Sequence, residues 1–182
     1  MQHYDFQNTF RALYDKAAGL YAKGQRGAET FFSADEQTFL TANGLTAQNL
    51  YDYAEDHNNY SEPGCDLALG IEFIRRDYFL FNQHSKPSGV ALDPNTMPAK
   101  TDAVRGIEWL PRIIPKAKAK LRGELPSSLM YCCGGDRRFF KTHDINPVEF
   151  LDLVRQNENN DKAIIEWVVA RSTAGKAASD AK

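Results

Sequence analysis

Helix-start signals followed by apolar residues at intervals of three and four recur along this chain, and this pattern constrains its fold most. Near the N-terminus, the aromatic and aliphatic residues of the segment Phe6–Tyr21 form one apolar stripe. Ser33 and Glu36 match a capping box, and Asn146-Pro147 with Glu149 opens a later helix in the same way. We therefore expect a mostly α-helical protein with few or no strands.

The segment Leu67–Phe81 is compatible with two kinds of secondary structure, a helix or a strand. Leu67, Ile71 and Ile74 have helical spacing, and other faces are also apolar, which predicts a central helix. A strand over residues 68–73 is the alternative, because Gly70 weakens a helix interior.

The chain of 182 residues is long enough for two small units. Prolines, glycine and polar residues interrupt the periodic pattern over residues 83–105, which predicts a loop or linker. We expect two helical units packed around this loop, one over residues 1–82 and one over 106–171. Residues 172–182 are small and polar and are expected to form a disordered tail.

Charge, hydropathy and cysteine content argue against some classes of protein, namely membrane proteins and strongly basic nucleic-acid-binding proteins. The formal net charge is −2 and the pI about 6.1, so no global positive field favours nucleic acid. No apolar run reaches the roughly 18 residues of a membrane span. Three cysteines without a secretory signature suggest free thiols in a reducing cytoplasm. We expect a cytoplasmic protein that does not bind membranes.

Several short motifs in the second half form one pattern over roughly residues 105–170. They are Leu110-Pro111-Arg112-Ile113-Ile114, Lys116-Ala117, Leu121, Gly123, Cys133-Gly134-Gly135-Asp136, Phe139-Phe140 and Ala163-Ile164-Ile165-Glu166-Trp167-Val168. This pattern resembles the bacterial domain-of-unknown-function family DUF5069. The resemblance implies a small bacterial fold unit and singles out Cys133 and Asp136, since a cysteine three residues before an aspartate belongs to the family pattern. It implies no reaction. Two positions depart from the pattern, with Gly134 in place of a usual proline and Pro115 in place of an acidic residue.

The segment from Tyr131 to Arg138 concentrates possible chemistry. Cys133 is a candidate nucleophile and Asp136 a candidate proton carrier, which makes these two the predicted catalytic residues. Nearby cations that favour a thiolate or bind an anion are the predicted ligand-binding residues Arg112, Lys116, Arg137 and Arg138. A purely structural role, without catalysis or ligand binding, explains the same residues equally well. Cysteine is often buried, Gly-Gly-Asp is a turn signal, and the arginines can simply pair with acidic neighbours.

Two further arginines, Arg75 and Arg76, lie in the most apolar predicted helix. A charge there must reach the surface or find a partner, so these two are added to the predicted ligand-binding residues. The simpler alternative pairs Glu72 with Arg76 at a spacing of four residues.

No metal site and no cofactor are predicted. Cys132 and Cys133 are adjacent and lack the loop that wraps zinc, and no histidine and carboxylate pair recurs at a ligand spacing.

The leading functional hypothesis is that the protein binds a small molecule or anion between its two helical halves, with an enzymatic role left open. The rival is a non-catalytic interaction module. Its basic segment, Arg112–Arg122, would bind a protein or nucleic acid, although without aromatic residues between the charges a solvated helix face explains the segment better.

Overall fold

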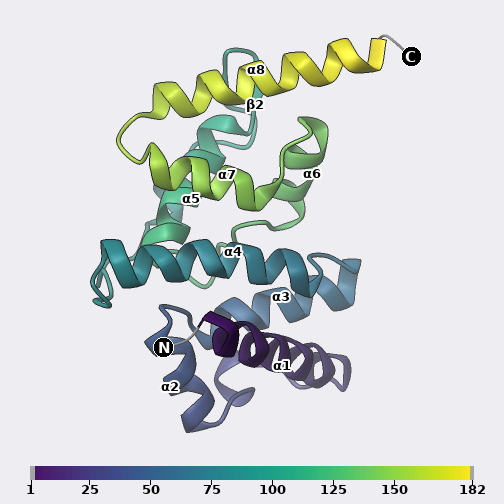
Figure 1. The fold of residues 1–182 in the computed structure, drawn as a ribbon. Coiled ribbons are helices and arrows are strands. Elements are labelled where there is room, and N and C mark those ends of the chain that lie inside the picture. Colours follow the sequence, from purple (N-terminus) through teal and green to yellow (C-terminus); the bar gives the residue numbers. More distant parts are fainter. Residues whose placement is uncertain (1–2, 181–182) are drawn as a thin grey trace. The chain divides into compact units, whose positions relative to one another are not determined.

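The computed structural model describes the backbone of residues 3–180 and the side chains of residues 3–172. The chain divides into two compact units, Met1–Ser88 and Gly89–Lys182. Helices account for most described residues and the two strands are very short (Figure 1), which confirms the predicted mostly α-helical fold. The predicted disordered tail, 172–182, falls almost wholly on residues whose side chains lie outside the described part and stays a prediction.

The N-terminal unit is built around its first helix. Its helical segments are α1 (His3–Ala22), the 3-10 turn η1 (Ala28–Thr30), α2 (Ala34–Ala42), α3 (Ala47–Tyr60), α4 (Cys65–Asp77) and the π-helical turn η2 (Tyr78–Asn82). α1 packs against both α3 and α4. The predicted apolar stripe of α1 is buried and forms the centre of this unit.

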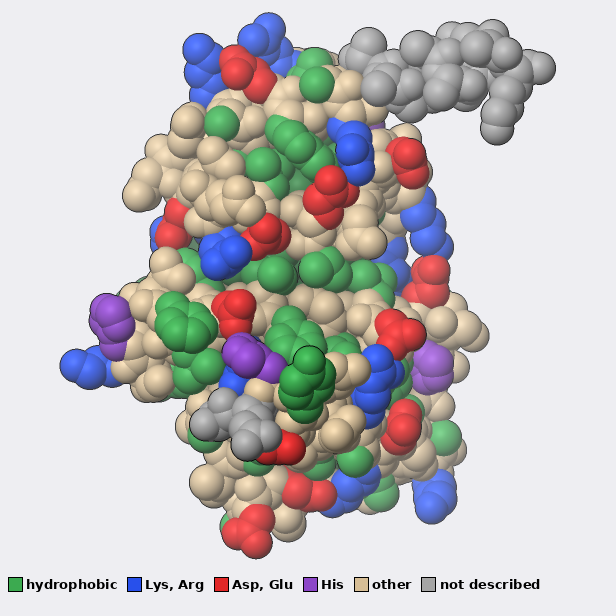
Figure 2. Space-filling view, viewed as in Figure 1, with side chains coloured by type: hydrophobic (Ala, Val, Ile, Leu, Met, Phe, Trp, Pro, Cys, Tyr) green, Lys and Arg blue, Asp and Glu red, His purple; other side chains and the backbone are tan. Residues whose placement is uncertain are grey.

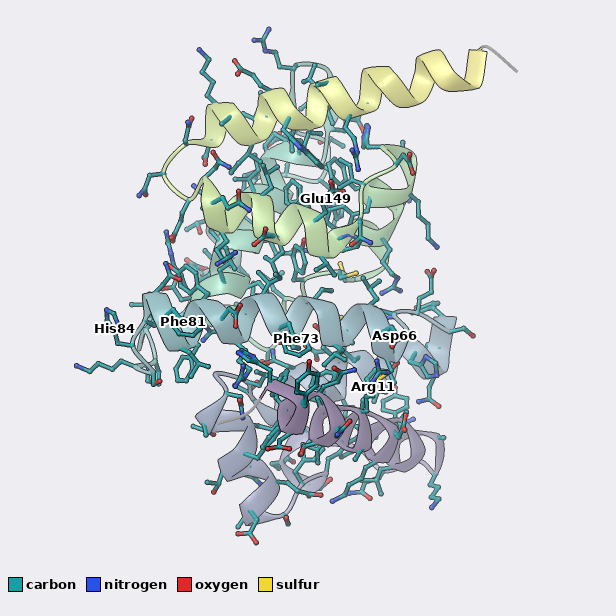
Figure 3. The ribbon with its side chains drawn as sticks, in the orientation of Figure 1. Arg11, Asp66, Phe73, Phe81, His84 and Glu149 are labelled. Atoms are coloured by element: carbon teal, nitrogen blue, oxygen red, sulfur yellow. The ribbon has the colours of Figure 1, made fainter. Side chains whose placement is uncertain are left out.

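Aromatic and ionic contacts join α1 to α4. The Phe6 and Phe73 rings meet edge to face with centroids 5.1 Å apart, and Figure 3 shows Phe73 on α4. Arg11 of α1 pairs with Asp66 of α4 at 2.6 Å on the exposed side of the same contact (Figure 3). Ring packing in the interior supplies the stability here, because exposed ion pairs contribute little.

Local signals determine where the helices of this unit begin. The Ser33 hydroxyl accepts from the Glu36 N–H and the Glu36 carboxylate accepts from the Ser33 N–H, which confirms the predicted capping box. Thr46 and Asn49 form a second box at the start of α3. Residues 68–73 are helical, so the alternative of a strand there is wrong. The apolar surroundings of α4 offset the intrinsic cost of Gly70 in a helix.

The C-terminal unit contains a small hairpin and the remaining helices. Its elements are η3 (Pro94–Thr96), β1 (Ala103–Val104), β2 (Ile107–Glu108), α5 (Leu110–Arg122), α6 (Gly134–Thr142), α7 (Pro147–Gln156) and α8 (Asp161–Asp180). The buried side chains of α5, α7 and α8 include Leu110, Ile113, Phe150, Leu151, Ile164 and Val168, each with no exposed surface. The apolar residues of these helices therefore form the core of this unit.

Residues 89–105 are part of this unit and are held against it. The Leu92 N–H donates to Glu124 O at 2.8 Å, and Arg112 Nη1 donates to Pro98 O at 2.6 Å. Arg105 and Gly106 have positive φ angles of 54° and 76°, as the two-residue type I′ turn of an antiparallel hairpin requires. The end of the segment predicted as a loop thus forms the first strand of an ordered hairpin, and the second strand lies just beyond it.

An aromatic cluster supports α6. Phe140 lies 5.9 Å from Tyr131 and 5.4 Å from Phe150, measured between ring centroids. The Tyr131 hydroxyl donates to Pro147 O at 2.8 Å, and burial raises the pKa of this phenol well above its ordinary value. The cluster fixes α6 against the start of α7.

Two details of the last helices differ from the predictions. Asn146 caps α7 as expected, but Glu149 (Figure 3) pairs with Arg171 at 2.8 Å instead of completing a capping box. The spacing of Ile164, Trp167 and Val168 predicts that all three point inward. Trp167 is only half-buried, with the Arg171 guanidinium 5.2 Å from its ring centroid. Glu149 thus uses a partner 22 residues away that spacing along one helix does not reveal, whereas Arg171 lies one turn beyond Trp167 on α8.

Candidate functional site

Asp136 is a fully buried carboxylate in the first turn of α6, and both its oxygens are engaged. Lys116 Nζ lies 2.8 Å from Oδ1 and 3.0 Å from Oδ2. Trp109 Nε1 donates to Oδ1 and the Cys132 N–H donates to Oδ2, each at 2.9 Å. A carboxylate with this many donors is fixed in place, and among the described residues the only side-chain cation it contacts is Lys116, so it is not poised to exchange a proton with a ligand in solution. The geometry therefore favours a structural role for Asp136, in which it positions its neighbours, over the predicted catalytic role.

Lys116 is the buried cation of this cluster. Its side chain is 3% exposed and the Asp136 side chain is 0% exposed, so the pair is shielded from water. Lys120, one turn further along α5, is also buried. The two lysines therefore do not form the solvated face expected of the basic segment. A buried ammonium needs a carboxylate partner, and Asp136 provides it.

Trp109 precedes α5 in a backbone conformation that a bulky residue rarely adopts. Its φ of 70° is left-handed, which costs on the order of 1–3 kcal/mol. The hydrogen bond from Nε1 to Asp136 offsets part of this cost. A Cβ atom added to Gly135 would lie 2.5 Å from the Trp109 ring, so only glycine fits there. Asp136 and Gly135 together hold the indole ring against α6.

Two adjacent cysteines precede α6, and they differ in surroundings. Cys132 is fully buried with a φ of 69°, a second left-handed residue tied to Asp136 through its N–H. Cys133 is half-buried at the N-cap of α6, and Lys116 Nζ donates to its Sγ at 3.5 Å. Cys65, Cys132 and Cys133 are all free thiols. The structure thus brings the predicted pair Cys133 and Asp136 together around Lys116.

The predicted arginines of this region separate into two groups. Arg137 is buried and donates to Cys132 O at 2.8 Å, while Arg112 donates to Pro98 O and lies 6.0 Å from the Trp109 ring centroid. Both therefore contact the backbone of their own unit. Arg138 is exposed and lines a pocket.

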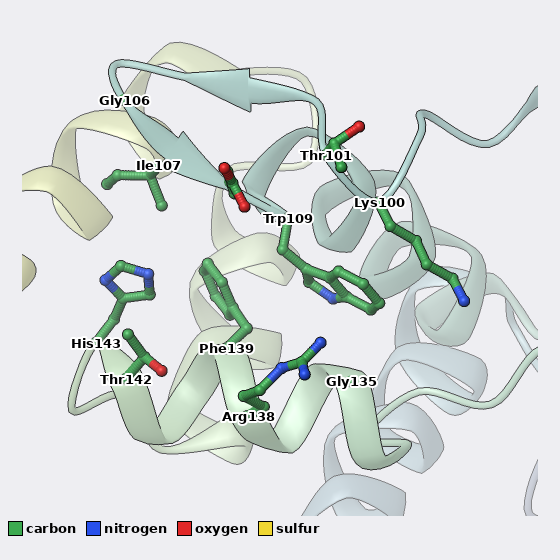
Figure 4. Close-up of a pocket in the computed structure, with 11 residues that line it drawn as sticks. Lys100, Thr101, Gly106, Ile107, Trp109, Gly135, Arg138, Phe139, Thr142 and His143 are labelled. Carbon is green, nitrogen blue, oxygen red and sulfur yellow. The ribbon is translucent and has the colours of Figure 1, made fainter.

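An open pocket of about 620 Å³ lies between the hairpin and one face of α6 (Figure 4). From the hairpin side it is lined by Lys100, Thr101, Gly106, Ile107, Glu108 and Trp109. From the side of α6 it is lined by Gly135, Arg138, Phe139 and Thr142, and by His143 at the C-cap of that helix. The pocket combines aromatic walls with hydroxyl, imidazole and cationic groups. This mixture of apolar surface and a few polar groups is typical of small-molecule sites.

Sequence reasoning missed most of this pocket. The α6 residues that line it recur at intervals of three and four from Gly135, which is one helical face and was a usable signal. The hairpin wall had no such signal, because each strand is two residues long. Trp109 was missed because nothing in the sequence marks its left-handed backbone.

Arg75 and Arg76 lie in the N-terminal unit and have partners there. Arg76 is 1% exposed, and its Nε donates to Asn43 Oδ1 at 2.6 Å. Its Nη1 lies 2.9 Å from His3 Nδ1 and its guanidinium carbon 4.9 Å from the Phe6 ring centroid. Arg75 donates to Gln83 Oε1 at 2.8 Å. Neither belongs to the pocket of the C-terminal unit.

Among the described residues, no group of three or more histidine, cysteine and acidic side chains is arranged to hold a metal ion. Within the same part of the chain, no helix combines the length and apolarity that crossing a bilayer requires.

The C-terminal unit is thus a helical domain with a hairpin-walled pocket beside a buried ion pair. Residues 96–181 match the family described as "Domain of unknown function (DUF5069)", which confirms the resemblance noted in the sequence. The match lies within the C-terminal unit. No curated protein and no solved structure matches the chain.

Proposed function

We propose that the C-terminal unit binds a small organic anion in the pocket between the hairpin and α6. The flat apolar part of the ligand would rest on Trp109 and Phe139, and its anionic group would face Lys100 and Arg138. The observation that carries this proposal is the pairing of those two cations with a fixed aromatic wall.

The cations of the pocket differ from several others in this unit. Lys100 and Arg138 are exposed and make no ion pair with any described residue. By contrast, Lys118 pairs with Asp161 at 2.5 Å and Arg122 pairs with Glu158 at 2.6 Å. Two exposed positive charges without an ion pair in the described part of the chain therefore lie at the pocket, where they attract an anion.

The remaining polar groups also suit an anion. His143 and the hydroxyls of Thr101 and Thr142 supply further hydrogen-bond donors along the wall. Glu108 is the one carboxylate among the lining residues, so the lysine and arginine leave an excess of one positive charge. We expect selection of monoanions over more highly charged ligands.

The aromatic wall is in place before a ligand arrives. Asp136 holds the Trp109 indole nitrogen, and Gly135 lets the ring approach α6 closely. Because a fixed wall loses little conformational freedom on binding, more of the contact energy remains for affinity.

A matched pair of ligands tests the proposal. 2-Naphthoate and the neutral 2-naphthylmethanol share a ring system and differ in charge, and their binding is followed by Trp109 fluorescence in a Trp167→Phe protein. We expect naphthoate to bind more tightly, and Arg138→Gln to weaken it about fivefold with no effect on the alcohol. Lys162→Gln removes an exposed charge on α8 and should change the affinity for neither the naphthoate nor the alcohol. Equal binding of both ligands, or no binding of either, would refute the proposal.

The geometry supports binding of a small molecule more than it supports an enzymatic role. It supports the third hypothesis, a non-catalytic interaction module, least. Cys133 and Asp136 are not among the residues that line the pocket. The basic segment of α5 is occupied by intramolecular partners, as the contacts of Lys116, Lys118 and Arg122 illustrate. On the face drawn in Figure 2, basic and acidic side chains are interspersed, whereas a nucleic-acid surface needs a patch of one sign.

A further inference from the structure

Cys133 and Lys116 place an oxidisable sulfur and a primary amine in direct contact. Nζ donates to Sγ at 3.5 Å, and the same Nζ lies 2.8 Å from Asp136 Oδ1. Cys133 is half-buried, so a small oxidant can reach it, whereas Lys116 is buried and has no freedom to move away. The amine, the sulfur and a proton acceptor therefore lie together in one cluster.

We propose that this cluster is an oxidative modification site, in which peroxide joins Cys133 to Lys116 through a sulfur–nitrogen bond. In the first step, the Cys133 sulfur attacks one peroxide oxygen. An S–O bond forms, the O–O bond breaks, and the leaving hydroxide takes the thiol proton as water. The product is a sulfenic acid, which condenses with nitrogen nucleophiles.

In the second step, Lys116 passes one proton to Asp136 and its nitrogen attacks the sulfenic sulfur. The S–N bond forms, the S–O bond breaks, and the hydroxyl leaves with a second proton from nitrogen as water. One thiol, one ammonium group and one hydrogen peroxide thus give one sulfenamide, two waters and one proton. Sulfur is oxidised by two electrons and peroxide is reduced by two.

Lys116 is favoured over the neighbouring thiol as the partner of the oxidised sulfur. The Cys132 side chain is fully buried, and Asp136 fixes its backbone N–H in a left-handed conformation. Cys133 Sγ, by contrast, contacts Lys116 Nζ directly. The atom that reacts first is the one already in contact.

Mass spectrometry of the full chain treated with hydrogen peroxide tests the proposal. We expect a loss of about 2 Da that a thiol reductant reverses, as condensation of a sulfenic acid with an amine requires. After trypsin, a peptide of residues 113–118 should be joined to one of residues 123–137. A loss of about 2 Da confined to the second peptide would indicate a Cys132–Cys133 disulfide or a backbone sulfenamide and would overturn the proposal.

Two variants separate the alternatives. Lys116→Arg keeps a cation for Asp136 but removes the amine nucleophile, so the joined peptides should disappear and dimedone should trap the sulfenic acid. Cys132→Ala leaves the amine and Cys133 in place, so the joined peptides should persist even if the arginine variant fails to fold. Disappearance of the mass loss in Cys132→Ala would contradict the role of Lys116.

Discussion

Two of the buried cationic side chains, one from each unit, are stabilised in different ways. Arg76 in the N-terminal unit donates to neutral Asn43 and contacts the Phe6 ring, and burial lowers its pKa. Lys116 in the C-terminal unit is paired with a buried carboxylate. Both cations were grouped as candidate ligand-binding residues from sequence. The comparison shows that a buried charge alone does not mark a site, since of these two cations only Lys116 lies beside a residue that lines the pocket, Trp109.

Of the substitutions that test this comparison, Asp136→Asn should change the free energy of unfolding most. The substitution leaves the Lys116 ammonium buried without a counter-charge, which should lower the free energy of unfolding by about 3 kcal/mol or more. Both tryptophans of the chain, Trp109 and Trp167, lie in the C-terminal unit, so urea unfolding followed by their fluorescence reports this unit. A loss below about 1 kcal/mol would mean that the pair is not the support we describe.

Gly135→Ala should come next. The new methyl group would lie 2.5 Å from the Trp109 ring, so the ring or α6 must shift, at a cost of about 2 kcal/mol and with a change in tryptophan emission. Gly134→Ala is the matched control, because its nearest neighbour is the end of Arg137 at 3.8 Å. That control should change stability by less than about 1 kcal/mol. Equal effects at both positions would show that the ring does not rest on α6.

Arg76→Met tests the other side of the comparison. Because Arg76 forms no salt bridge with any described residue, the variant should lose the hydrogen bonds to Asn43 and His3 and the cation contact with the Phe6 ring, about 1–2 kcal/mol in all. Urea unfolding followed by circular dichroism measures it, since the N-terminal unit contains no tryptophan. A cost as large as that of Asp136→Asn would remove the distinction between the two cations.

The smallest expected effect concerns the cap of α2. Burial disfavours the Glu36 carboxylate, but hydrogen bonds from Lys16 and the Ser33 backbone outweigh it and lower the pKa of Glu36. A lowered carboxyl pKa stabilises the fold above its unfolded value, about 4.3, and this contribution is lost as the pH falls through the folded value. Glu36→Gln should therefore cost about 0.5 kcal/mol at pH 7, and this cost should shrink as the pH falls below about 4.3. A cost that does not change as the pH is lowered would rule out the carboxylate as its source.

Sequence reasoning succeeded where the cause is local. Apolar spacing predicted the burial of α1, and residue types that cap helices predicted the starts at Ser33 and Asn146. It failed where the cause is a distant partner. Asp136 stabilises the left-handed Trp109 from a separation of 27 residues, and no periodic pattern encodes that contact.

The candidate site was predicted in part for the same reason. Cys133, Asp136 and Lys116 do lie together, but their types alone did not reveal that Asp136 is saturated with hydrogen bonds. The pocket lies on a different face of α6 from Asp136. Its other wall is a hairpin whose strands are too short to show an alternation of apolar and polar residues.

The central claim is that this pocket, with Trp109 as its wall, receives an organic anion. Its most direct test is an amide chemical-shift titration of the full ¹⁵N-labelled chain with 2-naphthoate. We predict saturable shifts at Gly106, Gly135 and Arg138, with those at Arg138 reduced for 2-naphthylmethanol. Shifts confined to residues outside the pocket, or none at any concentration, would contradict the claim.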